Sequence, residues 1–207
     1  MGAPDLIRHL ERFARFPSTV HGPGHWARVC RFGACLAERE GLSPAAARAV
    51  EVFAWTHDLA REDDGGGREH AVAGAAHLGE FAAELFPDLS PWQLAIVRVA
   101  IELHSDGMTA QQAHERGLLD PVFEIDPGGF SAERTIAAIG CAWDADRLDL
   151  QRFGIRPEPA LMSTRSWREV LPLSSRIHDE VLHMRGDESV PMGSFRYDPT
   201  LRARRGK

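Results

Sequence analysis

His57 and Asp58 stand side by side in the stretch EVFAWTHDLA. Neighbouring residues on a helix point about 100° apart, so such a pair rarely shares a target. A buried metal ion is the exception, because flanking helices can supply the remaining ligands. His25, His104 and Asp146 occur in three other apolar stretches and offer such imidazole and carboxylate groups. A mixed set of this kind can hold a divalent transition metal and leave coordination positions open.

An open metal site points to hydrolysis, because a bound metal lowers the pKa of its water and neutralises charge on a phosphoryl oxygen. A buried Asp58 without a partner would cost roughly 2–5 kcal/mol, so a cation should lie against it. The alternative is an ordinary hydrogen-bonded pair of His57 and Asp58, with unrelated histidines elsewhere. The order H…HD…H…D on successive helices favours the metal site over this alternative.

The order His25, His57-Asp58, Asp146 resembles the HD-domain metal-dependent phosphohydrolase superfamily. The local motifs are similar as well: H-x-x-R-V begins at His25, and the phrase A-D-R-L-D contains Asp146. The resemblance covers roughly residues 18–155. It implies an all-helical fold, a metal bound by these four residues, and hydrolysis of phosphate mono- or diesters, often of nucleotides.

His70 and His104 resemble the two additional histidines of HD proteins that bind two metals. His104 lies deep in an apolar helix, which favours a role in the site. His70 follows a glycine loop, and for it a role in the site and ordinary surface solvation are the two alternatives. His77 lies seven residues beyond His70 on the same helical face and could replace it. His21 precedes His25 by four residues and is expected to support a ligand or face the substrate rather than bind metal.

Phosphate recognition needs cations as well as metal. Arg61, three residues after Asp58, and Arg147, next to Asp146, are predicted to hold the remaining phosphate oxygens. Glu62 is a candidate general base that positions water. For each of these three side chains, ordinary surface solvation is the alternative.

Neighbouring residues are candidates for supporting roles. Arg28 lies three positions after His25 and so on the same helical face. Asp149 could orient an arginine or a metal ligand from behind.

Two branches of the HD-domain superfamily are not favoured by the sequence. The acidic pair of alarmone hydrolases falls one residue late here, and residues 105–130 lack the Gly-Tyr-Pro phrase of cyclic-dinucleotide phosphodiesterases.

Helical periodicity and end signals predict one all-α domain over residues 1–185, with five or six helices around one core and a loose tail over 186–207. Ser-Pro pairs at 43–44 and 90–91 mark two helix starts. The segment 120–130 is expected to be a loop. The expected helices cover 4–16, 24–40, 44–59, 69–86, 91–104, 109–117 and 131–150, with a short piece at 174–184.

The composition excludes several classes of protein. The hydrophobic fraction of 43% indicates a globular chain, and the net charge of −6 gives no general affinity for nucleic acid. The three cysteines form no C-x-x-C motif, which favours a reducing cytoplasm. Neither a signal peptide nor an apolar membrane-spanning segment is recognisable.

The sequence therefore predicts a cytoplasmic phosphohydrolase with one or two divalent ions (Mn, Fe, Ni, Co, Zn or Mg) that activate water. Its ligands would be His25, His57, Asp58, His70, His104 and Asp146, and its substrate a small phosphorylated compound such as a nucleotide. One alternative is a catalytically silent HD-type binding or regulatory module whose structural metal is enclosed by protein. Another is a helical scaffold that recruits a partner through the RARRGK tail.

Overall fold

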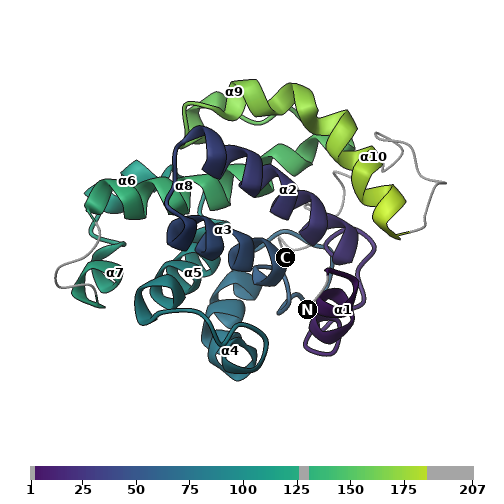
Figure 1. Cartoon of the computed structure of the whole chain (residues 1–207), viewed down its shortest axis with the longest axis horizontal. Coiled ribbons are helices and arrows are strands. Elements are labelled where there is room, and N and C mark those ends of the chain that lie inside the picture. The colour runs from purple at the N-terminus through teal and green to yellow at the C-terminus, as the bar shows by residue number, and fades with distance from the viewer. Residues whose placement is uncertain (1–2, 126–130, 186–207) are drawn as a thin grey trace, which may run out of the picture.

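The computed structural model describes residues 3–125 and 131–185, and within these ranges the chain forms helices, turns and loops without strands (Figure 1). The predicted all-α class is confirmed. The long helices are α2 (Pro23–Arg39), α3 (Pro44–Thr56), α4 (Glu69–Leu85), α5 (Pro91–Leu103) and α8 (Ala132–Leu148). The shorter ones are α1 (Ala3–Leu10), α6 (Ala110–Glu115), α7 (Asp120–Ile125), α9 (Trp167–Val170) and α10 (Ser174–Arg185), with 3₁₀ turns η1 (Asp149–Phe153), η2 (Pro159–Leu161) and η3 (Leu171–Leu173).

Side-chain caps fix where three of the long helices, α3, α5 and α8, begin. The Ser43 hydroxyl accepts a hydrogen bond from the backbone N–H of Ala46, with proline at the first helical position. Ser90 and Gln93 form a reciprocal capping box at the start of α5. Both Ser-Pro starts were predicted, and both are confirmed. They matter for function because the ends of these helices position the candidate site.

Helix α3 lies at the centre of the bundle and packs against α2, α5 and α8, while α4 packs on the far side of α5 (Figure 1). The buried apolar side chains form one continuous core. At Gly33 in α2, an added Cβ would lie 2.8 Å from Cγ1 of Val50, so glycine lets α2 and α3 approach closely. Trp143 in α8 donates its indole N–H to the Ala100 carbonyl in α5 at 2.9 Å.

In two predicted elements the bounds were wrong because tertiary contacts override local signals. The helix predicted over 4–16 ends at Leu10, after which Arg15 donates its backbone N–H to the Leu59 carbonyl at 3.0 Å. The loop predicted over 120–130 is helical over its first six residues, because Val122 is fully buried and proline is tolerated in a first turn. Residues 126–130 and the predicted tail, 186–207, lie outside the described residues.

The helix predicted over 44–59 also ends early, at Thr56. His57 and Asp58 therefore occupy the turn that follows α3 rather than the helix itself. Both are buried, with relative exposures of 0% and 4%. In the described part of the chain, no helix is long and apolar enough to cross a membrane.

Candidate metal centre

The six predicted metal ligands lie at helix ends that converge on one region. Two of them are in first turns, three directly follow a last turn, and one is within a last turn. Helix ends carry unpaired backbone groups and side chains that are not committed to the bundle's packing, so they can face a common point. The ligands are His25 (α2), His57 and Asp58 (after α3), His70 (α4), His104 (after α5) and Asp146 (α8).

The first group of donor atoms comes from His25, His57, Asp58 and Asp146. Nε2 of His25 lies 3.0 Å from Nε2 of His57 and 3.3 Å from both Oδ2 of Asp58 and Oδ1 of Asp146. Nε2 of His57 lies 3.5 Å and 3.6 Å from the same two oxygens. In a tetrahedral site with bonds of about 2.1 Å, ligand atoms are about 3.4 Å apart. The first group therefore has the spacing of a metal site.

The second group comes from Asp58, His70 and His104. Oδ1 of Asp58 lies 3.4 Å from Nε2 of His70 and 3.9 Å from Nε2 of His104, and the two Nε2 atoms are 3.1 Å apart. Asp58 thus divides its two oxygens, with Oδ2 facing the first group and Oδ1 the second. This is the arrangement of a carboxylate that can bridge two cations.

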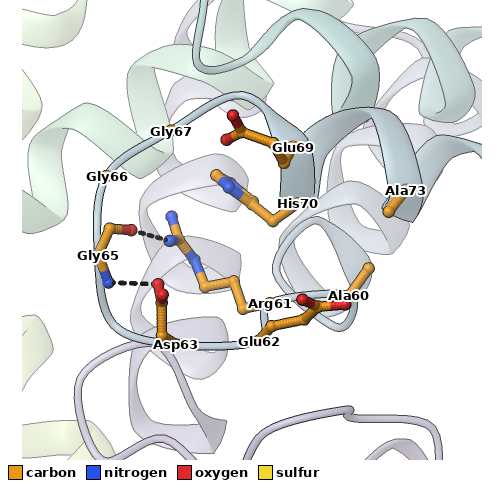
Figure 2. Close-up of a pocket in the computed structure, with 10 residues that line it drawn as sticks. All are labelled: Ala60, Arg61, Glu62, Asp63, Gly65, Gly66, Gly67, Glu69, His70 and Ala73. Atoms are coloured by element: carbon orange, nitrogen blue, oxygen red, sulfur yellow. Dashed lines mark hydrogen bonds between the residues drawn. The ribbon is translucent and has the colours of Figure 1, made fainter. Parts of the chain in front are cut away.

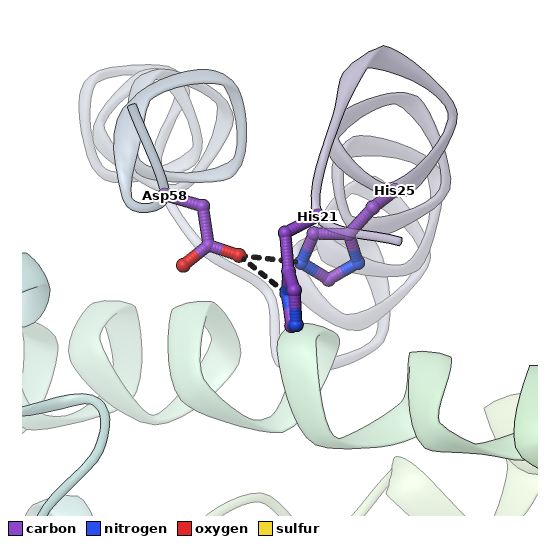
Figure 3. A group of neighbouring side chains, drawn as sticks. All are labelled: His21, His25 and Asp58. Atoms are coloured by element: carbon purple, nitrogen blue, oxygen red, sulfur yellow. Dashed lines mark hydrogen bonds and ion pairs between the residues drawn. The ribbon is translucent and has the colours of Figure 1, made fainter. Parts of the chain in front are cut away.

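His21 adds to the first group. Its Nδ1 lies 3.0 Å from Oδ2 of Asp58, and its side chain is 18% exposed (Figure 3). His21, His25 and Asp58 form a further set of atoms that could hold a metal ion. A supporting role was predicted for His21, and the structure brings it into direct contact with a predicted ligand. Burial lowers the pKa of His21, which favours its neutral form.

Backbone carbonyls orient two of the imidazole rings. Nδ1 of His57 lies 3.2 Å from the carbonyls of Phe53 and Ala54, and Nδ1 of His104 lies 2.6 Å from that of Ile101. A carbonyl only accepts hydrogen bonds, so each Nδ1 carries the proton. Nε2 is then the nitrogen that faces the other donor atoms, as a metal-binding imidazole requires.

Asp149 orients the third ring. Nδ1 of His25 lies 2.7 Å from Oδ2 of Asp149. Arg28 donates to both oxygens of the same carboxylate, at 2.6 and 3.2 Å, and Arg152 also pairs with it. Burial opposes ionisation of Asp149, but Arg152 and Arg28 outweigh it and hold its pKa well below the usual range. The sequence proposed such a role for Asp149. It missed Arg152, which the D-x-x-R spacing could have indicated.

The charges of the first group fit a cation. Nε2 of His25 and Nε2 of His57 face each other at 3.0 Å, and two lone pairs at that distance repel unless a proton or metal lies between them. Burial and Arg152 would lower the pKa of His25, but Asp146, Asp149 and Asp58 raise it to about 9. The ring therefore attracts a positive charge at this point. A divalent ion would satisfy the same atoms.

The histidines of the second group favour their neutral forms. Burial and the nearby Arg61 lower the pKa of His70 to about 3. Burial and His57 lower the pKa of His104 to about 4. Neutral imidazole is the form that binds metal. The donor atoms of both groups, imidazole nitrogens and carboxylate oxygens, are those that divalent transition metals prefer.

A pocket of about 560 Å³ lies over both donor groups. Its floor includes His25, His70, His104 and Asp146. Part of its wall is apolar and comes from Val20, Leu150, Phe153 and Ile155, while the loop Gly65–Gly67 and three arginines, Arg61, Arg68 and Arg152, line other parts. A volume of this size is typical of small-molecule sites.

Arg61 lies inside the site, and Glu62 lies outside it. Nε of Arg61 donates to Oδ1 of Asp58 at 2.6 Å. The side chain of Glu62 is 82% exposed and lies 3.8 Å from Arg15. It lines an adjoining pocket of about 330 Å³ that also includes Arg61 and His70 (Figure 2). The structure brings Arg61 to the donor groups and leaves Glu62 away from them.

Arg147 is held by backbone carbonyls rather than by the donor groups. Its two terminal nitrogens donate to Leu161 at 2.5 Å and to Met108 at 2.8 Å. Asp144, two residues before Asp146, accepts hydrogen bonds from the backbone of Ser163 and Thr164. Arg147 and Asp144 thus attach α8 to the turn before α6 and to the loop after η2, and the structure does not bring Arg147 to the site.

The structure shows which of the two histidines of α4, His70 or His77, lies at the donor groups. Helical periodicity alone could not decide between them. His77 contacts Arg15 and Glu80 on the outer side of α4, and its side chain is 37% exposed. His70 lies in the first turn of α4 and faces the second group. His70 is therefore the histidine of α4 that joins the candidate centre.

A scan against protein-family models and searches of curated proteins and of solved structures found no match. The resemblance to the HD-domain superfamily consequently rests on the ordered motifs alone. The geometry adds that buried His and Asp side chains from separate helices form groups that could hold a metal ion.

Proposed function

We propose that this chain is a metal-dependent phosphohydrolase of the HD type that acts on a small phosphorylated compound. The observation that carries the proposal is the division of the Asp58 carboxylate between two donor groups beneath an open pocket. Two-metal phosphatases and nucleases use ions about 3.5–4 Å apart. A carboxylate shared between two sites is suited to that spacing.

In this proposal, His25, His57, Asp58 and Asp146 hold the first ion, and Asp58, His70 and His104 hold the second. The ions supply an activated water and neutralise charge on the phosphoryl oxygens. Asp149 and the carbonyls behind His57 and His104 hold the imidazole rings in the binding tautomer.

Protein groups around the pocket suit a phosphate ester. Arg61 and Arg152 line it, and arginine binds phosphate oxygens with directional N–H groups. The apolar wall, which includes Leu150, Phe153 and Ile155, offers a surface for the organic part of the substrate. A nucleotide has both parts and is the substrate that the motif resemblance also favours.

The pocket also favours a catalytic metal site over a purely structural one. A structural ion is normally enclosed by four protein ligands, whereas a catalytic ion keeps an open position. Here His25, His70, His104 and Asp146 all line a pocket of about 560 Å³, so water and substrate can reach the donor groups.

The test combines metal content with phosphate release. Wild type and Asp58→Ala are purified without an affinity tag or added metal, and metal is measured by elemental mass spectrometry. We expect one or two equivalents in wild type and their loss in the variant. Hydrolysis is then followed as inorganic phosphate released from nucleoside monophosphates and as the alcohol and monoester products formed from phosphodiesters.

The control is His77→Ala, which removes an exposed histidine outside the donor groups and should change neither result. If wild type holds no metal after incubation with manganese, iron, nickel or zinc, the proposal fails. If it holds metal but hydrolyses none of the compounds, a binding or regulatory module becomes the better interpretation.

A further inference from the structure

Arg61 and the second donor group share one oxygen atom. Nε of Arg61 donates to Oδ1 of Asp58 at 2.6 Å, and the same Oδ1 faces Nε2 of His70 at 3.4 Å and Nε2 of His104 at 3.9 Å. The Arg61 side chain is 11% exposed, so water screens its charge weakly. A guanidinium therefore already neutralises the oxygen on which a second ion would depend.

The two donor groups consequently differ in charge. The first contains the carboxylates of Asp58 and Asp146, and among the described residues no arginine forms an ion pair with Asp146. The second has one carboxylate oxygen and two imidazoles, and the positive charge of Arg61 lies against that oxygen. A divalent ion is attracted to the first group and is partly repelled at the second.

We infer that Arg61 makes the two metal positions unequal, so that the second ion binds weakly until a phosphate group draws Arg61 away from Asp58. This inference rests on the metal centre of the proposed function and concerns how that centre is loaded. The first ion binds at His25, His57, Asp58 and Asp146 without competition. The second binds about tenfold or more weakly while Arg61 pairs with Oδ1 of Asp58.

The surroundings of Arg61 allow it to exchange partners. Nη1 donates to the Gly65 carbonyl at 2.9 Å, whereas Nη2 has no hydrogen-bond partner in the part of the chain that the structure describes. Arg61 lines the large pocket over the metal groups and also the smaller one beside Glu62 (Figure 2). A phosphate in the large pocket can therefore accept hydrogen bonds from Arg61.

Binding of phosphate and of the second ion is then coupled. A phosphate that takes up Arg61 leaves Oδ1 of Asp58 to the ion, and it also adds negative charge next to that ion. Because coupling between two ligands is reciprocal, the second ion raises the affinity for phosphate by the same factor. The centre would acquire its full charge when the anion that needs it is present.

The experiment is a titration of the metal-free, full-length protein with Mn²⁺, in which free Mn²⁺ is counted by electron paramagnetic resonance. We expect wild type to bind one equivalent tightly and a second about tenfold or more weakly. In Arg61→Gln, the second step should strengthen by about tenfold or more while the first changes little. Saturating inorganic phosphate should strengthen the second step in wild type, and should do so less in Arg61→Gln.

Three further variants separate charge from shape. Arg61→Met also removes the charge and keeps an unbranched side chain. It should strengthen binding of the second ion in the same way, and it replaces Arg61→Gln in the experiment if that variant folds poorly. Arg61→Lys keeps the charge and should keep the second ion weak. Arg68→Gln is the matched control, because Arg68 lines the same pocket but pairs with Asp106 at 3.0 Å. Circular dichroism confirms that each variant is folded.

Two equally tight ions in wild type would overturn the inference. So would a second ion that is unchanged or weakened in the charge-removing variants, because Arg61 would then support Asp58 as a ligand. Either result leaves the proposed function intact if wild type releases phosphate. Conversely, unequal loading controlled by Arg61 without hydrolysis of any phosphate ester would leave this inference standing and remove the proposed function.

Discussion

Nδ1 of His25 lies 2.7 Å from Oδ2 of Asp149, a residue 124 positions later in the chain. The contact joins the first turn of α2 to the 3₁₀ turn after α8. It fixes the ring of His25 so that Nε2 faces His57. The donor groups therefore depend on a carboxylate that is not itself a predicted ligand.

Asp149→Asn should weaken metal binding by about 10- to 100-fold, because the amide cannot replace the charged partner that orients His25 and raises its basicity. It should also lower the free energy of unfolding by roughly 3–5 kcal/mol, since Arg28 and Arg152 lose the carboxylate that pairs with both. Competition with a chelating dye measures the first effect, and urea denaturation of the metal-free protein the second.

Asp88→Asn is the matched control for this substitution. Asp88 pairs with Arg48 at the surface, where its side chain is 56% exposed, so its loss should cost less than about 1 kcal/mol and leave metal affinity unchanged. Metal affinity in Asp149→Asn equal to that of wild type would show that the carbonyl-bound rings alone determine the site.

Asp58→Ala and Asp146→Ala should have different effects on metal content. Asp58 contributes an oxygen to each donor group, so its removal should abolish both positions. Within the described residues, the ion pairs of the Asp146 carboxylate are with His25 and His57, so its removal should weaken the first position and spare the second. Titration with Mn²⁺ and elemental mass spectrometry give the number of ions bound. Loss of the second ion in Asp146→Ala, with the first retained, would contradict the assignment.

Local signals predicted most of the bundle. Helix α5 begins where Ser90 and Pro91 indicate, since the cap and the proline act within one turn. The end of α1 depends instead on Arg15, which reaches the Leu59 carbonyl 44 residues away in sequence. The helical character of α7 depends on burial of Val122. Neither the contact of Arg15 with Leu59 nor the burial of Val122 can be predicted from the residues next to them in sequence.

The donor residues of the candidate site could be predicted because few residue types bind metal ions. Histidines and aspartates in apolar stretches indicated the donor groups, but periodicity placed His70 and His77 on one face and could not choose between them. Arg147 follows Asp146 directly, yet adjacent helical residues point about 100° apart, and it contacts carbonyls instead. Helix geometry alone predicts that the side chains of Asp146 and Arg147 point in different directions. Only the folded structure shows that Arg147 binds the carbonyls of Leu161 and Met108.

Arg147→Ala should therefore destabilise the protein without changing metal content. The side chain is 11% exposed and donates to two carbonyls, and a hydrogen bond from a charged group contributes about 1.5–3 kcal/mol. We expect the melting temperature to fall by several degrees, as measured by differential scanning calorimetry. Normal stability combined with a raised KM for a phosphate ester would instead identify Arg147 as a substrate ligand.

The apolar wall of the pocket predicts how the proposed enzyme selects its substrate. Ile155 is half-buried and lines the pocket, and its backbone N–H donates to the Leu150 carbonyl at 3.2 Å. Ile155→Thr keeps the branched shape but adds a hydroxyl where an apolar group would bind. Removing one apolar contact of this kind changes discrimination by about 10-fold or more.

We expect Ile155→Thr to lower kcat/KM for phosphate esters of aromatic groups, with little change for glycerol phosphate, because only the former bury apolar surface against the wall. Ile125→Thr makes the same replacement at a side chain that is 48% exposed and outside this pocket, so it should alter neither substrate. Equal losses for both esters in Ile155→Thr would mean that the wall maintains the shape of the pocket and does not contact the organic group of the substrate.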